Sequence, residues 1–167
     1  MTDRWRGRRA GLALVAFLVA AVLATTGART GDRGVVVVTE PSGNVLARVP
    51  LEGADRFSLR YRNSLYGTLA KEHFTLSPDG SFQLRELEAE QLAVLEEYYA
   101  INVAPERGES GWWTAPPAYE LELGELRVAA TDLGQRSLLV PGQPPLDLWP
   151  LVEDRAPSVI ITIEKGR

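Results

Sequence analysis

The sequence predicts a single, mainly β domain that follows a short apolar leader. A chain of 167 residues with 45% hydrophobic residues can bury one core of ordinary size. After residue 34, short segments that alternate apolar and polar side chains recur, and turn-forming residues separate them. This pattern favours a sandwich-like or partly closed barrel fold with at most one short helix.

The first 28 residues are typical of a signal peptide or a membrane anchor. Four arginines lie in the first ten residues, and an apolar run from Ala10 to Ala24 follows them, which predicts an N-terminal hydrophobic helix. The run is about 15 residues long, whereas a helix that crosses a bilayer needs about 20. Small residues from Ala24 to Ala28 permit cleavage, so a cleaved signal and a retained anchor both stay open.

Both alternatives predict the same location for the rest of the chain. Basic residues stay on the cytoplasmic side of a membrane, so the chain after the leader lies on the other side. We therefore expect residues 34–165 to form an extracytoplasmic domain, either secreted or anchored to the cytoplasmic membrane through the leader.

Composition excludes several function classes. The net charge is −4 although the leader is basic, so the domain itself is acidic, and we expect no nucleic acid partner. The chain has no cysteine, which removes disulfides, thiolate catalysis and a lipid-bearing cysteine. With His73 as the only histidine, we expect neither a metal site nor a cofactor.

Two hairpins are predicted in the first half of the domain. The β-branched run 34–39 and the return strand 45–50 flank a Pro-Ser-Gly-Asn turn. Strands 69–76 and 81–87 flank the turn Ser77 to Gly80, whose Ser-Pro-Asp-Gly sequence favours a tight reversal. Between the hairpins, residues 56–64 alternate cleanly and predict a further strand.

The second half is less regular. Residues 85–100 have the composition of a short helix, but the preceding strand could continue into them, so residues 88–97 stay open between the two. Residues 105–118 predict a long loop. Further strands are expected at 119–123 and 125–131 as a pair around Gly124, and then at 138–140, 146–151 and 158–163.

Two neighbouring strands carry a pattern found in one bacterial family. The segments 57–64 and 70–76 resemble the domain-of-unknown-function 1850 family of uncharacterised envelope proteins, in which an aromatic-x-His-Ser strand precedes a Glu-x-Phe strand. The matching residues are Tyr61, Ser64, Glu72 and Phe74. Asn63 stands where the family commonly has histidine. The resemblance implies an accessory role beside TRAP-TAXI solute transporters, with a membrane permease or a solute-binding protein as partner.

Alternation provides a candidate site within the same two strands. It places Asn63 and Glu72 on the apolar faces of consecutive strands, and a buried carboxylate needs a partner. We expect the Asn63 amide to donate a hydrogen bond to the Glu72 carboxylate, with Tyr61 and Ser64 as neighbours. The pair would be a structural polar contact or the floor of a small ligand pocket.

A hydrolase triad is the third functional possibility. Ser64, His73 and Glu72 have suitable side chains, but adjacent residues of a strand point to opposite faces. His73 and Glu72 therefore cannot share a site in a regular strand, and no Gly-x-Ser-x-Gly motif is present. We expect no enzymatic activity.

Aromatic side chains provide a second candidate surface. Trp112 and Trp113, with Tyr98 and Tyr99, could form a lip for a ligand or cover an open end of the sandwich. Together, these features predict an extracytoplasmic accessory or binding module that assists a transporter. The alternative is a structural or interaction domain of the cell envelope unrelated to transport.

Overall fold

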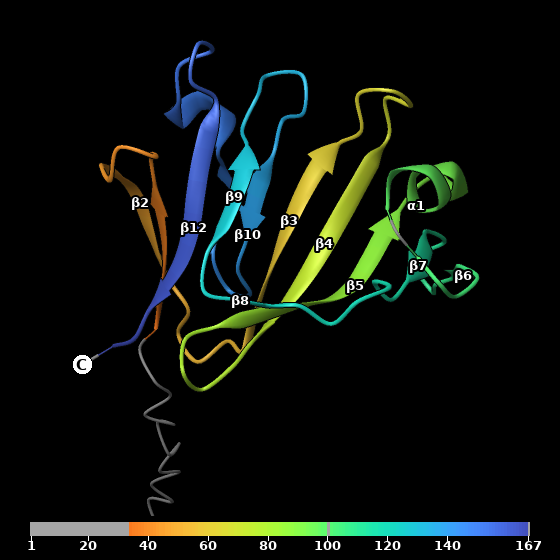
Figure 1. Cartoon of the computed structure of the whole chain (residues 1–167), viewed down its shortest axis with the longest axis horizontal. Helices are drawn as coiled ribbons and strands as arrows, with labels where there is room; N and C mark the ends of the chain where they lie inside the picture. The colour runs from red at the N-terminus through yellow and green to blue at the C-terminus, as the bar shows by residue number, and fades with distance from the viewer. Residues whose placement is uncertain (1–33, 100, 167) are drawn as a thin grey trace, which may run out of the picture.

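The computed structural model describes residues 34–99 and 101–166, which form two antiparallel sheets and one α-helix (Figure 1). The expected mainly β, sandwich-like fold is confirmed. Sheet A has the strand order β2 (Val45–Pro50), β1 (Val35–Thr39), β12 (Ser158–Glu164) and β9 (Leu126–Ala129). The leader expected at residues 1–28 lies outside the described residues.

Sheet B is the wider of the two. Its order is β11 (Leu146–Asp147), β10 (Ser137–Leu139), β3 (Arg56–Arg62), β4 (Leu69–Leu76), β5 (Phe82–Ala89), β7 (Trp113–Ala115) and β6 (Glu106–Arg107). The short strand β8 (Glu122–Leu123) also pairs with β5, and a 3-10 helix spans Trp149–Leu151.

Both predicted hairpins form. β1 pairs with β2 and β4 pairs with β5, each in antiparallel register. The second turn follows from its sequence, because the Asp79 carboxylate accepts a hydrogen bond from the Ser81 backbone N–H at 2.9 Å, and Gly80 adopts a φ of 95°. A bulge after His73 shifts the register of the β4–β5 pair.

Residues 88–97, for which the sequence allows a strand or a helix, contain parts of both. β5 continues to Ala89, and α1 then begins at Leu92 and ends at Tyr98. Two expectations for the second half are wrong, and a third is wrong in part, because the expected strand 146–151 ends at Asp147 and a 3-10 helix follows at Trp149–Leu151. The predicted loop 105–118 contains the hairpin of β6 and β7. The expected pair around Gly124 does not form, because β8 joins sheet B through β5 whereas β9 joins sheet A through β12.

The main core lies between the two sheets. Its centre is a cluster of three buried rings: Phe57 stacks on Phe74 with centroids 4.9 Å apart, and Phe82 meets both rings edge-on. A second, smaller core lies between sheet B and α1, where the buried Val94 and Leu95 of the helix meet Leu87 and Ala115. The inner face of sheet B is therefore covered by sheet A over one part and by α1 over another.

We expect Phe57→Ala to lower the free energy of unfolding by about 3–5 kcal/mol, because the ring is fully buried and its removal leaves a cavity among the other two rings. Urea unfolding followed by tryptophan fluorescence measures the change. The matched control is Val45→Ala, since Val45 is 51% exposed, and its effect should stay within about 0.5 kcal/mol. Equal losses in the two variants would contradict this assignment of the core.

Candidate functional site

The candidate site lies where sheet A and α1, which cover different parts of the inner face of sheet B, meet. β9 is the edge strand of sheet A, and the C-terminal end of α1 carries Tyr98 and Tyr99. We call the space between them, over the inner face of sheet B, the seam. Among five prominent cavities in the described part of the chain, two have linings that combine sheet B with β9 and with the end of α1.

Four side chains form a hydrogen-bonded cluster in the seam, which we call the polar bridge: Tyr61, Glu72, Tyr99 and Arg136. The Tyr99 hydroxyl donates to the Glu72 carboxylate at 2.7 Å and lies 2.6 Å from the Tyr61 hydroxyl. Arg136 Nη1 lies 3.4 Å from the other Glu72 oxygen, and its guanidinium stacks over the Tyr61 ring at 4.7 Å. Both charged side chains are more than four-fifths buried.

Burial keeps the two bridge tyrosines protonated. It raises the pKa of Tyr61 to about 12. Burial also raises the pKa of Tyr99, and the negative charge of the neighbouring Glu72 adds to the effect. Tyr99 therefore remains a hydroxyl donor to Glu72 through the neutral pH range, which fixes the direction of the hydrogen bond between them.

One cavity of the seam, which we call the leucine cavity, has a volume of about 290 Å³. Apolar side chains make up most of its lining, and Glu72 and Tyr99 are the polar bridge residues in it. The apolar lining residues include Phe74, Leu84, Leu87, Leu123 and Leu126. Tyr119 and Leu121 also line it and are 78% and 61% exposed.

The other cavity, which we call the Arg136 cavity, has a volume of about 150 Å³. Its lining comes from the end of β3, the end of α1, the end of β9 and the loop before β10. The lining residues are Tyr61, Arg62, Asn63, Ser64, Tyr98, Ala129, Thr131, Leu133, Gly134 and Arg136. The loop is tightly turned, because Gln135 adopts a left-handed φ of 44° immediately before Arg136.

The expected hydrogen bond between Asn63 and Glu72 is wrong. The strand register places Glu72 opposite Leu59, four residues before Asn63, so the two side chains share a face of the sheet but not a contact. Glu72 instead binds Tyr99 and Arg136. The Asn63 side-chain oxygen accepts hydrogen bonds from the backbone of Leu65 and Tyr66, because the strand has ended and the chain is turning.

The candidate residues are nevertheless near one another in the seam. Tyr61, Asn63 and Ser64 line the Arg136 cavity, and Glu72 lines the leucine cavity on the other side of the polar bridge. Sequence reasoning missed Arg136, which lies in an irregular loop with no motif around it. It also missed the segment 117–123, whose contribution to the leucine cavity depends on the pairing of β8 with β5.

The four aromatic residues proposed as a lip do not form one surface. Tyr98 and Tyr99 lie in the seam. Trp113 packs against the smaller core, whereas the Trp112 ring lies 4.3 Å from the Lys71 ammonium. Neither tryptophan lines either seam cavity. Trp112 and Trp113 diverge because consecutive residues of an extended chain point to opposite faces.

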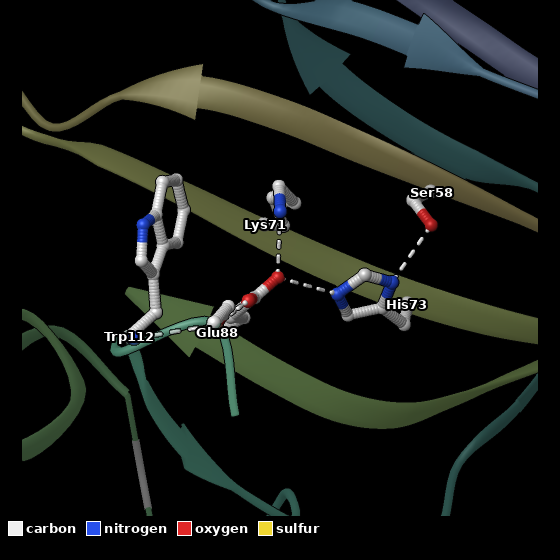
Figure 2. Close-up of polar contacts among 6 residues, drawn as sticks. Ser58, Lys71, His73, Glu88 and Trp112 are labelled. Atoms are coloured by element: carbon white, nitrogen blue, oxygen red, sulfur yellow. Dashed lines mark hydrogen bonds and ion pairs between the residues drawn. The ribbon is translucent and has the colours of Figure 1, made fainter. Parts of the chain in front are cut away.

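A second polar network lies on the outer face of sheet B (Figure 2). The Glu88 carboxylate binds Lys71 at 2.7 Å, Ser110 at 3.0 Å and His73 Nε2 at 3.3 Å. The Ser58 hydroxyl lies 2.8 Å from His73 Nδ1. A neutral histidine with its proton on Nε2 satisfies both of its contacts, since Ser58 then donates and Glu88 accepts.

The outer-face network aligns a serine with a histidine and a carboxylate, but of the triad considered from sequence it contains only His73. Ser64 lies in the seam, and Glu72 is on the inner face, as the alternation of β4 requires. The signal for the observed trio is the strand register, which pairs Ser58 with His73 and Lys71 with Glu88. None of the five cavities is lined by Ser58, His73 or Glu88.

Comparisons with protein-family models, curated proteins and solved structures give no match to this chain. The resemblance drawn from residues 57–76 therefore stays a prediction. Within residues 34–99 and 101–166, no helix is long and apolar enough to span a bilayer.

The pKa of Glu88 gives a pH test of the outer-face network. Burial acts to raise this pKa, but the hydrogen bonds from Lys71 and Ser110 and the charge of Lys71 outweigh burial and hold it below the ordinary value of 4.5. A carboxyl group whose pKa is lowered by folding stabilises the protein above the unfolded pKa. That contribution is lost as the pH falls through the folded pKa.

We therefore expect Glu88→Gln to destabilise the protein by about 1 kcal/mol at pH 7, because charge-assisted hydrogen bonds are lost. The difference in the free energy of unfolding between this variant and the unmodified protein should shrink as the pH falls below 4.5. Urea unfolding at pH 7, 5, 4 and 3 measures it. The exposed Glu86 on the same strand provides the control variant Glu86→Gln. A loss for Glu88→Gln that is constant with pH would refute the assigned role.

Proposed function

We propose that this chain is an extracytoplasmic binding module that holds a small, mainly apolar molecule in the leucine cavity and assists a membrane transporter. The observation that carries the proposal is the leucine cavity itself, an apolar space of about 290 Å³ with a hydrogen-bonding carboxylate in its wall. Ligand sites of globular proteins combine an apolar lining with a few placed polar groups in this way.

The lining defines the chemistry of the occupant. Phe74, Leu84 and Leu87 offer an apolar floor from sheet B, and Leu126 closes the side that faces sheet A. The Glu72 carboxylate is an acceptor, so it favours a ligand that carries an N–H or O–H donor. A neutral, mainly apolar molecule that carries such a donor fits both requirements.

The exposed rim supports binding rather than a purely structural cavity. Tyr119 and Leu121 are large apolar side chains that remain mostly in water, although they adjoin an apolar space. Single exposed apolar residues are ordinary on protein surfaces, but apolar residues gathered at the mouth of a cavity indicate an interaction site. A ligand in the cavity would remove part of their surface from water.

The outer-face network supports a binding role over hydrolysis. A serine nucleophile needs a cavity where a substrate carbonyl can meet both the hydroxyl and donors for the developing oxyanion. Ser58 and His73 instead lie on the face of a regular sheet, outside all five cavities. Their contacts with Glu88 are accounted for by cross-strand pairing.

The assignment to transport rests on the export signal and on the family resemblance of residues 57–76. Its partner would be a permease or a solute-binding protein of a TRAP-TAXI-type system. A structural or interaction domain of the envelope, unrelated to transport, is the alternative. Genes for a permease and a solute-binding protein beside this gene favour the transport role. Their absence beside the genes of relatives favours the structural or interaction domain.

Ligand binding is tested with N-phenyl-1-naphthylamine, a neutral fluorescent probe that is mainly apolar and carries one N–H donor. We expect its fluorescence to rise on binding, and Tyr119→Ala combined with Leu121→Ala to weaken the affinity about tenfold, because the rim contacts are lost. The matched control combines Val45→Ala with Val103→Ala, two exposed apolar residues outside the cavity. Equal affinity in the two double variants would sink the proposal.

The transport role is tested by co-purification from the native membrane, with an affinity tag at the C-terminus of the full chain. We expect the permease encoded beside this gene to be enriched at least tenfold over a tagged, unrelated exported protein. Enrichment no greater than in that control, in membranes that contain the permease, would exclude a stable complex and support the alternative.

A further inference from the structure

The lining of the Arg136 cavity includes positively charged side chains but no negatively charged one. Arg62 and Arg136 both line it, whereas no aspartate or glutamate does. Asp132 lies between two lining residues but is not one of them. The remaining polar residues of the lining are hydroxyl and amide side chains, which can all donate hydrogen bonds. The lining therefore carries two cations, one of them partly balanced by Glu72, and several donors, within a domain that is acidic overall.

The Arg136 guanidinium is held in place with most of its hydrogen-bonding capacity unused. Its side chain is 13% exposed, and its one described hydrogen bond is the 3.4 Å contact with Glu72. Its Nε is fully buried and has no hydrogen-bond partner among the described residues, so the donors open to a ligand are those of the two terminal nitrogens. A guanidinium has five N–H donors, and a buried donor left unsatisfied destabilises the folded protein.

Neighbouring groups orient this cation. One face of the guanidinium stacks on the Tyr61 ring, and Glu72 takes one donor, so its position is determined from two sides. The left-handed turn at Gln135 sets the backbone that carries it. An arginine fixed in this way has lost its side-chain entropy before any ligand arrives, which favours binding.

Asn63 adds a neutral donor. It is 4% exposed, and its side-chain oxygen is occupied by the backbone N–H groups of Leu65 and Tyr66 at 3.0 and 3.1 Å. The amide NH2 group must then point the other way, and Asn63 lines the cavity. The two hydrogen bonds that fix the turn both use the Asn63 oxygen, so the NH2 group takes no part in them.

The structure assigns the Arg136 cavity as a binding site for a small organic carboxylate. Its oxygens accept hydrogen bonds from Arg136 and Asn63, and its apolar part contacts Tyr98 and Leu133, which are 61% and 63% exposed at the rim. A planar carboxylate matches the geometry of a guanidinium, and the charge-assisted hydrogen bonds are stronger than neutral ones. The exposed rim favours an organic anion over an inorganic one, which would leave both side chains in water.

This site goes beyond the proposed function and does not depend on it. The two cavities lie on opposite sides of the polar bridge and share no lining residue. A failure of the naphthylamine probe to bind the leucine cavity therefore leaves the carboxylate site untouched, and the reverse also holds.

Isothermal titration calorimetry of the purified protein with benzoate tests the assignment. Benzamide has the same shape without the charge, and inorganic phosphate has charge without an apolar part. We expect benzoate to bind at least tenfold more tightly than either. Equal binding of benzoate and benzamide would overturn the role of charge. Phosphate that binds as tightly as benzoate would overturn the organic carboxylate.

A pair of variants at Leu133 then locates the bound anion. Leu133 is exposed, so its replacement should leave folding intact, and thermal unfolding checks this. Leu133→Glu and Leu133→Gln have nearly the same shape and differ in charge. We expect the glutamate variant to bind benzoate about tenfold more weakly than the glutamine variant, because a carboxylate at the rim repels the ligand.

Arg136→Gln should abolish the binding of benzoate, and Arg48→Gln is its control. Arg48 is also paired with a glutamate, Glu164, but lies outside the cavity. Should Arg136→Gln fail to fold, the Leu133 pair still decides the question. Equal affinity of the two Leu133 variants for benzoate would refute the site.

Discussion

The width of sheet B is the constraint on which the rest of the structure depends. Its inner face is too wide for sheet A alone, so the segment after β5 folds into α1 and covers the remaining part. Sheet A and α1 meet over this face and leave a gap between them. The seam is that gap, and the polar bridge and both cavities lie at the border of the two cores, since Tyr61 belongs to the smaller core and Phe74 to the main one.

Glu72 connects the parts that surround this gap. It comes from β4, its hydroxyl donor follows α1, and its arginine precedes β10, so one carboxylate joins three regions that are distant in sequence. A buried carboxylate is costly without such partners. The hydrogen bonds therefore link the position of Tyr99, after α1, to that of Arg136, in the loop before β10, through Glu72.

The regular parts of the fold could be predicted because local chemistry determines them. Turn residues such as Asp79 and Gly80 and the alternation of β3 and β4 predicted the hairpins and the inner-face position of Glu72. The partner of Glu72 could not be predicted, since alternation gives a face but not a position along the strand. Arg136 was missed for a related reason, because its role depends on a loop conformation with no short-range signal. Strands of two residues, such as β6 and β8, depend on tertiary pairing rather than on propensity.

The pairing of β1 with β12 also decides how the domain would stand on a membrane. Val35 pairs with Glu164 at one end of sheet A, whereas Ala129, which lines the Arg136 cavity, pairs with Ser158 at the other. The seven residues of β12 span about 20 Å between these ends. A tether that precedes Gly34 would therefore leave this cavity at the membrane-distal tip. A binding partner in the same bilayer would then have to extend about 20 Å past the membrane-proximal end of the sheet to reach this cavity.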